Sequence, residues 1–154
     1  MYYIIVAGLM FALPVLSVAV ELTATHASIG AAIFCKWFAF WSVGWRLLLA
    51  GVKQIAQPQY TAHMILGLKD RESLILVREL GFANVAIGLL GVLSLLIPSW
   101  QLAAALVGGM FYALAGTNHV FQIHRNRLQN VAMLSDIFAA VVLLGACAVA
   151  VVSK

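Results

Sequence analysis

Five long runs of apolar residues follow one another along the chain, separated by short stretches in which polar and charged residues gather. A helix that crosses the hydrocarbon core of a bilayer needs about 20 mostly apolar residues. Inside a bilayer the backbone must satisfy its own hydrogen bonds, which a helix does within a single segment. The pattern therefore predicts an all-α integral membrane bundle of about five transmembrane helices, at residues 2–20, 28–52, 74–97, 100–123 and 130–152.

The stretch between the second and third predicted spans is more polar. Its middle, residues 60–68, is short and only moderately apolar, so we expect it to lie at the membrane interface rather than to cross. A mixed-charge run at 69–72 follows, and Asp70 or Ser73 is placed to cap the next helix. Pro98 leaves room only for a tight hairpin, so the third and fourth helices should be antiparallel neighbours.

The first apolar run has two interpretations. It resembles the hydrophobic part of a secretory signal peptide, but no Lys or Arg precedes it, and a signal peptide carries positive charge there. We favour a retained helix, which Pro14 is expected to kink.

Composition supports the membrane assignment. Hydrophobic residues make up 64% of the 154 residues and charged residues 9%, whereas soluble domains carry about a quarter charged residues. A soluble globular domain is therefore excluded, and we expect residues 1–154 to form one transmembrane domain. The net charge of +4 is spread over helix ends, which favours contact with lipid head groups and argues against a nucleic-acid partner.

The basic residues also predict an orientation. Those in or beside the connections after the second and fourth spans are Lys53, Lys69, Arg71, Arg78, Arg125 and Arg127, and the other connections carry none. Positive charge is retained on the cytoplasmic side. We expect a cytoplasmic N-terminus and an external C-terminus, in a bacterial inner (plasma) membrane.

Polar residues within spans are costly and usually face a partner or a cavity. Under the predicted orientation, four helices place such residues in the cytoplasmic half of the bundle. The candidate ligand-binding or structural cluster is Arg46, Glu79, Asn84, Asn118, His119, Gln122 and Asp136. Matched depth predicts an ion pair between Arg46 and Asp136, with Glu79 as the rival partner. The pair would serve either a pocket or simply the cohesion of the bundle.

Helical projection at about 100° per residue places Cys35, Ser42 and Arg46 on one inward face of the second span, and Asp136 and Cys147 on one face of the fifth. Cys35 and Cys147 should then meet at a common depth, as inert buried thiols or as a redox pair. Tryptophans at 37, 41 and 45 form a separate stripe that packs or faces lipid, with a ligand platform as the alternative. Glycine faces on the third and fourth spans serve packing inside the bundle or between subunits.

Motifs for catalysis and cofactors are missing. The chain has no nucleotide-binding loop, no Ser/His/Asp arrangement and no metal-ligand spacing. We therefore expect no metal and no cofactor, and lean away from an enzyme. His119 is interpreted as a hydrogen-bonded core residue, with a ligand contact or proton-handling group as the alternative.

The segment 78–91, Arg-Glu-Leu-Gly-Phe-Ala-Asn-Val-Ala-Ile-Gly-Leu-Leu-Gly, resembles the helix of DoxX-like small bacterial membrane proteins that begins with a Glu and continues through spaced glycines. The segment from Arg46 to Lys53 is similar to their Arg- and Lys-bearing helix. The resemblance covers about residues 45–116. It implies a helical bundle, usually of four helices, with mostly uncharacterised roles, some of them in oxidant handling or as respiratory accessory subunits. It also implies Arg46, Lys53 and Glu79 as site residues.

Three functional hypotheses follow. The first is binding or transport of a small hydrophobic or amphipathic molecule, such as a quinone or a lipid, through the polar cluster. The second is an accessory or structural subunit of a larger membrane complex, or a homo-oligomer. The third is a lipid-phase enzyme or thiol redox protein.

Overall fold

The computed structural model describes residues 2–26 and 28–153 and confirms the all-α prediction, because these residues form helices, turns and loops and no strand. Among them are five helical stretches long and apolar enough to cross a membrane. We name them spans 1 to 5: Tyr2–Thr25, Ala31–Ala56, Ser73–Leu93, Pro98–Val120 and Arg127–Val152.

The span boundaries differ from the predicted ones by a few residues, and local hydrogen bonds explain the differences. Span 1 continues to Thr25, with the Thr23 and Thr25 hydroxyls donating back to carbonyls one turn earlier, and it stops where His26 adopts a left-handed conformation at φ 51°. Span 5 begins before residue 130 because Asn126 and Gln129 form a reciprocal capping box.

The third span ends at Leu93 rather than at residue 97. A turn follows at Ser94, whose hydroxyl donates to the Gly91 carbonyl over 2.7 Å. Ile97 takes a non-helical conformation (φ −120°, ψ 88°) directly before Pro98, as expected for a residue that precedes proline. A short 3₁₀ turn, η4 (Pro98–Trp100), then leads into α6 (Gln101–Val120).

Spans 1 and 2 each contain a wide π-helical segment. Span 1 consists of α1 (Tyr2–Ala7), η1 (Gly8–Ala12) and α2 (Leu13–Thr25), and span 2 of α3 (Ala31–Phe38), η2 (Ala39–Trp45) and α4 (Arg46–Ala56). The η1 segment immediately precedes Pro14. Proline lacks an N–H and its ring collides with the carbonyl four residues earlier, so the wider turn accommodates it where we predicted a kink. The two π segments touch through Ser42, whose hydroxyl donates to the Leu9 carbonyl over 3.2 Å.

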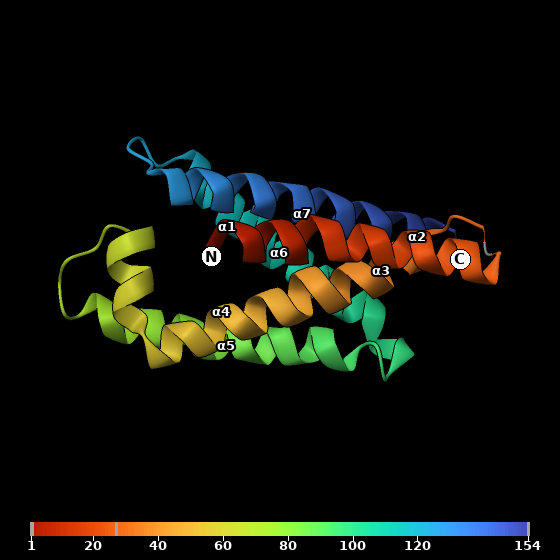
Figure 1. Ribbon diagram of the computed structural model, residues 1–154, viewed down its shortest axis with the longest axis horizontal. Coiled ribbons are helices and arrows are strands. Elements are labelled where there is room, and N and C mark those ends of the chain that lie inside the picture. The colour runs from red at the N-terminus through yellow and green to blue at the C-terminus, as the bar shows by residue number, and fades with distance from the viewer. Residues whose placement is uncertain (1, 27, 154) are drawn as a thin grey trace.

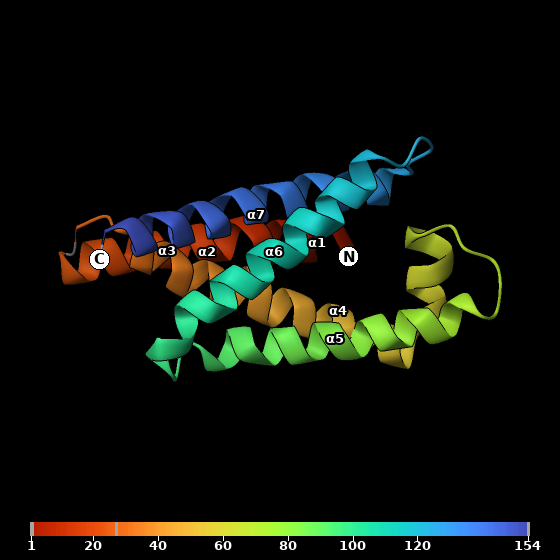
Figure 2. The ribbon, with the colours of Figure 1, turned by 180° about the vertical axis from the view of Figure 1, so that it is seen from behind.

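The spans are arranged in two groups. Figure 1 shows α4 paired along its length with α5 (Ser73–Leu93), while α1, α2 and α7 (Arg127–Val152) run together on the other side. Figure 2 shows α6 crossing diagonally from the end of α5 to the start of α7. The buried core between the groups includes Met10, Phe38, Val43 and Leu143.

Glycines allow α5 to approach span 2 at backbone distance. A Cβ added at Gly88 would lie 2.5 Å from the Leu48 backbone nitrogen, and one at Gly91 would lie 2.5 Å from that of Gly44. On α6, Gly108 similarly faces Val43. Of the two roles predicted for the glycine faces, the structure therefore shows packing inside the bundle.

The predicted interfacial stretch contains a short helix, η3 (Tyr60–Ile65), that does not cross the bundle. It packs against α5 and α7. The Asn126 amide at the start of α7 donates to the carbonyls of Met64 and Ile65, over 3.3 and 3.2 Å. These bonds hold η3 over the end of the bundle at which span 1 begins, which we call the N-terminal end.

Candidate functional site

A pocket of about 420 Å³ lies at the N-terminal end of the bundle. All five spans and η3 contribute to its lining, from Tyr2 at the start of span 1 to Asp136 in the first third of span 5. Its volume is within the range of small-molecule sites, about 300–1,000 Å³. Most of the lining is apolar or aromatic, and the polar residues are Tyr2, Arg46, Lys53, Gln54, Tyr60, Thr61, Asn84, Tyr112, His119 and Asp136.

Within the part of the chain that the structure describes, two buried polar atoms of the lining have no hydrogen-bond partner, namely Nε of Arg46 and Oδ1 of Asn84. The Asn84 side chain is only 3% exposed, and its amide nitrogen is occupied because it donates to Oε1 of Gln54 over 2.7 Å. Buried polar groups in folded proteins are nearly always paired, and an unpaired one costs about 1–3 kcal/mol. An unpaired donor and an unpaired acceptor in one pocket are therefore features of a site that receives a partner.

The charged groups of the pocket are held apart. The Arg46 guanidinium lies over the Tyr2 ring at 5.8 Å, and the Lys53 ammonium lies over the Tyr60 ring at 3.6 Å. Asp136 is 8% exposed. The predicted ion pair between Arg46 and Asp136 is wrong: the ion pair found among the described residues joins Glu21 and Lys36. Arg46 and Asp136 nevertheless line the same pocket.

His119 belongs to a polar chain along the pocket wall. Its Nδ1 lies 3.3 Å from Oε1 of Gln122, which also accepts a 3.2 Å hydrogen bond from the Gln129 amide. Arg125 closes the end of α6 by donating to the carbonyls of His119 and Gln122 over 2.9 and 2.8 Å. The 8% exposed imidazole of His119 is thus fixed in orientation while it lines the pocket.

The predicted cluster is brought together in part. Arg46, Asn84, His119 and Asp136 line the pocket, and Gln122 joins it through His119. Glu79 and Asn118 do not line it and are exposed. Glu79 precedes the inward Asn84 by five residues, which turns it about 140° away on an α-helix, and Asn118 is about 100° from His119. Depth alone had grouped these two residues with the others.

Several pocket residues were not predicted from the sequence. Tyr2, Gln54, Tyr60 and Thr61 lie at helix ends or in η3, outside the regions in which polar residues were counted as intramembrane. Gln54 follows Arg46 by eight residues, which places it about 80° away, at the edge of the same inward stripe of an α-helix. That spacing was the available signal for Gln54, whereas nothing in the local pattern marks Tyr2.

The two thiols lie outside the pocket. Cys35 and Cys147 are free and buried in the main core, on α3 and α7, close enough to interact with each other. The Cys147 sulfur also lies 3.9 Å from the Leu102 carbonyl oxygen. The thiols therefore meet as predicted, surrounded by packed apolar side chains.

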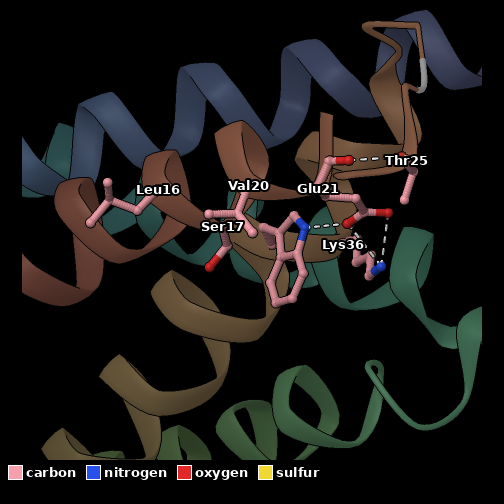
Figure 3. A pocket seen from close by; sticks show the side chains of 7 residues that line it. Leu16, Ser17, Val20, Glu21, Thr25 and Lys36 are labelled. Atoms are coloured by element: carbon pink, nitrogen blue, oxygen red, sulfur yellow. Dashed lines mark hydrogen bonds and ion pairs between the residues drawn. The ribbon is translucent and has the colours of Figure 1, made fainter. Parts of the chain in front are cut away.

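A shallower polar groove lies between α2 and α3, at the opposite end of the bundle from the pocket. Figure 3 shows Glu21 facing Lys36, whose ammonium donates to both carboxylate oxygens over 3.0 and 2.9 Å. The indole N–H of Trp37 donates to the same carboxylate, and that of Trp41 donates to the Ser17 hydroxyl over 2.9 Å. Trp37 and Trp41 of the tryptophan stripe are thus packed against span 1. Glu21 was missed because span 1 was expected to end at residue 20.

No group of three His, Cys, Asp or Glu side chains able to hold a metal ion is found within residues 2–26 and 28–153. The protein is a five-span helical membrane bundle with a polar pocket at one end.

Comparison with known families assigns it more closely. The sequence matches the family of unknown function DUF6790 over residues 2–153, and the chain belongs to that family. The match provides no link to DoxX-like proteins, so that resemblance stays a prediction. Searches of curated proteins and of solved structures yield no match.

Proposed function

We propose that the protein binds a small amphipathic molecule in the pocket at the N-terminal end of the bundle. The observation that carries the proposal is the pairing of a pocket of about 420 Å³ with two buried polar atoms that have no partner among the described residues, Nε of Arg46 and Oδ1 of Asn84. A ligand head group placed between them would satisfy both atoms. The apolar part of the ligand would contact side chains such as Leu47, Ile65 and Phe111.

The same surroundings favour a ligand that arrives from the lipid phase. Large apolar side chains such as Leu49, Leu80 and Met64 are exposed on the outside of the protein, and the first two also line the pocket. An amphipathic molecule in the bilayer therefore meets a continuous apolar surface up to the pocket. Transport would require a second opening, so we propose binding as the activity.

We further propose that the pocket faces the cytoplasm. The connections 57–72 and 121–126 both lie at the N-terminal end, and they or the adjoining helix starts contain Lys69, Arg71, Arg78, Arg125 and Arg127. Positive charge of this kind is retained on the cytoplasmic side. Reporter fusions at residues 68 and 97 test this orientation: a cytoplasmic reporter should be active at 68 and inactive at 97, and the reverse result contradicts it. The bacterial inner membrane remains the expected location.

The alternative hypotheses receive less support. The glycine faces that suggested a partner protein are used within the bundle. Cys35 and Cys147 are enclosed in the core and line neither of the two pockets described above. An accessory subunit and a thiol redox protein therefore stay predictions without a specific structural observation in their favour.

The proposal is tested by filling the pocket. Ala115 lines it, whereas Ala103 lies on the same helix with its side chain exposed. Protein extracted in a mild detergent should carry a non-bulk amphiphile, detected by native mass spectrometry, in the wild type and in Ala103→Phe but not in Ala115→Phe. Finding only bulk membrane lipid in the wild type, or the same bound molecule in all three proteins, contradicts the proposal.

A further inference from the structure

The unpartnered atoms in the pocket specify more than the presence of a ligand. Nε of Arg46 is a donor and Oδ1 of Asn84 is an acceptor, and both are buried in one lining. We infer, on the basis of the binding function proposed above, that the ligand is a single-chain monoanionic amphiphile whose head carries a hydroxyl or N–H donor beside the anion. A hydroxylated fatty acid is the simplest molecule of this class.

Arg46 supplies the anion-binding half of the site. Its Nε is buried and has no hydrogen-bond partner among the described residues. The Tyr2 ring lies 5.8 Å from the guanidinium carbon and the Tyr2 side chain interacts with the cation, which leaves Nε as the open donor. Arginine donors are fixed in a planar fork that matches a carboxylate or phosphate, so an anionic oxygen is the partner that fits.

Asn84 requires the ligand head to carry a hydrogen-bond donor. Because its amide nitrogen already donates to Gln54, the open position is the carbonyl oxygen, which only accepts. A plain carboxylate offers no donor to this oxygen and would leave it unpaired when the pocket is filled. A site built to bind a hydroxyl rejects an analogue that lacks it, because the buried group of the protein then stays unsatisfied.

The charges of the pocket lining favour a ligand with a single negative charge. Two cations, Arg46 and Lys53, face one carboxylate, Asp136, which leaves one net positive charge among these three groups. A monoanion neutralises it, whereas a neutral head leaves it uncompensated and a cationic head adds to it. Lys53 lies 3.6 Å from the centre of the Tyr60 ring, at the edge of the pocket covered by η3.

The pocket volume favours a ligand with one alkyl chain. A value of about 420 Å³ is in the lower part of the range for sites that take drug-sized ligands. A diacyl lipid would leave most of its bulk outside, whereas one alkyl chain and its head can be enclosed.

The test uses the full-length protein in lipid nanodiscs and five probes with the same chain length. They are dodecanoate, its α-hydroxy and β-hydroxy derivatives, dodecanol and dodecyltrimethylammonium, with dissociation constants measured by calorimetry. We expect the better of the two hydroxy acids to bind roughly tenfold more tightly than dodecanoate, the factor that corresponds to about 1.4 kcal/mol and to one hydrogen bond to a buried group. Dodecanol should bind more weakly than dodecanoate, and the cation should bind least.

Variants assign the preference to its residues. Asn84→Leu should reduce the hydroxy-acid preference to near unity, and Asn118→Leu, an exposed residue of the same type on α6, should retain it. Arg46→Met should remove the preference for acid over alcohol, with the exposed Arg78→Met as its control. The probe series on the wild-type protein tests the inference even if a variant fails to fold.

The outcomes separate this inference from the proposed function. Equal binding of dodecanoate and both hydroxy acids, or tightest binding of dodecanol, overturns the inference while amphiphile binding stands. Binding of none of the five probes, together with no bound molecule in the extracted protein, overturns both.

Discussion

Replacement of Gly88 by alanine tests how closely the packing of α5 against span 2 determines the structure. A Cβ at Gly88 would lie 2.5 Å from the Leu48 nitrogen, 2.9 Å from the Leu48 Cα and 2.9 Å from the Gly44 carbonyl oxygen. All three atoms are backbone, so no side-chain rotation relieves the collision. Gly145, also within a helix, has nothing within 4 Å of the added Cβ, which makes Gly145→Ala the matched control.

The magnitude follows from this geometry. Carbon atoms pack at about 3.5–4.0 Å, so α5 must move away from span 2 by about 1 Å at this level, and a gap of that size loses a quarter to a half of the dispersion energy of the contacts. Overpacking of a close interface costs about 1–3 kcal/mol and sometimes more. Alanine is intrinsically better than glycine in a helix by about 1 kcal/mol, and that gain applies equally to both variants. We expect Gly88→Ala to be less stable than Gly145→Ala by about 3 kcal/mol.

Thermal unfolding in a mild detergent, followed by circular dichroism, measures the difference. Gly145→Ala should unfold at or slightly above the wild-type temperature, and Gly88→Ala clearly below it. Since Asn84 is one turn from Gly88, the Gly88→Ala variant should also bind the ligand more weakly. A Gly88→Ala protein as stable as Gly145→Ala would refute the reasoning, because it would mean that the two helices are not held at backbone contact.

Three further perturbations probe hydrogen bonds near the pocket. Tyr112→Phe removes the donor to the carbonyl of Ser42 and should lower stability by about 1 kcal/mol, measured by the same thermal unfolding. The amide of Ser73 donates to Asp70 and lowers the pKa of that carboxyl below its usual 3.8. The contribution of this hydrogen bond is therefore complete above pH 3.8 and lost as the pH falls through the lower folded-state pKa. The protection factor of the Ser73 amide in hydrogen exchange should fall there in the wild type and not change in Asp70→Asn. Asn126→Ala removes the cap of α7 and both bonds to η3; it should cost about 1 kcal/mol and increase proteolysis within η3, and unchanged proteolysis would show that η3 is held by other contacts.

The sequence was sufficient to predict the spans because each is defined by a long apolar run. It also predicted which face of span 5 is buried, since that span is regular and Asp136, Leu143 and Cys147 all lie in the interior. Boundaries shifted where a local feature ended or began a helix, as at the left-handed His26 and the capping residue Asn126. Such bonds depend on only a few residues, and hydropathy does not register them.

The site was harder to predict because depth and direction are separate quantities. Loop charges and span lengths give the depth of a residue, and by depth alone Glu79 and Asn118 belonged with Arg46. Direction depends on where neighbouring helices lie, and α5 is oriented by glycines that press it against span 2. That contact points Asn84 inward and leaves Glu79 exposed.

The π segment of span 2 explains why Arg46 and Asp136 share a pocket without pairing. Projection at 100° per residue places Arg46 on the same face as Cys35, eleven residues earlier, but residues 39–45 between them are π-helical. A π-helix closes its hydrogen bonds over five residues rather than four, so each of its residues turns the chain by less. Cys35 therefore faces the core beside Cys147, whereas Arg46 is rotated away from that line towards the space between α4, α5 and α6. The irregularity that separates the two charges is also what keeps the donor of Arg46 free for a ligand.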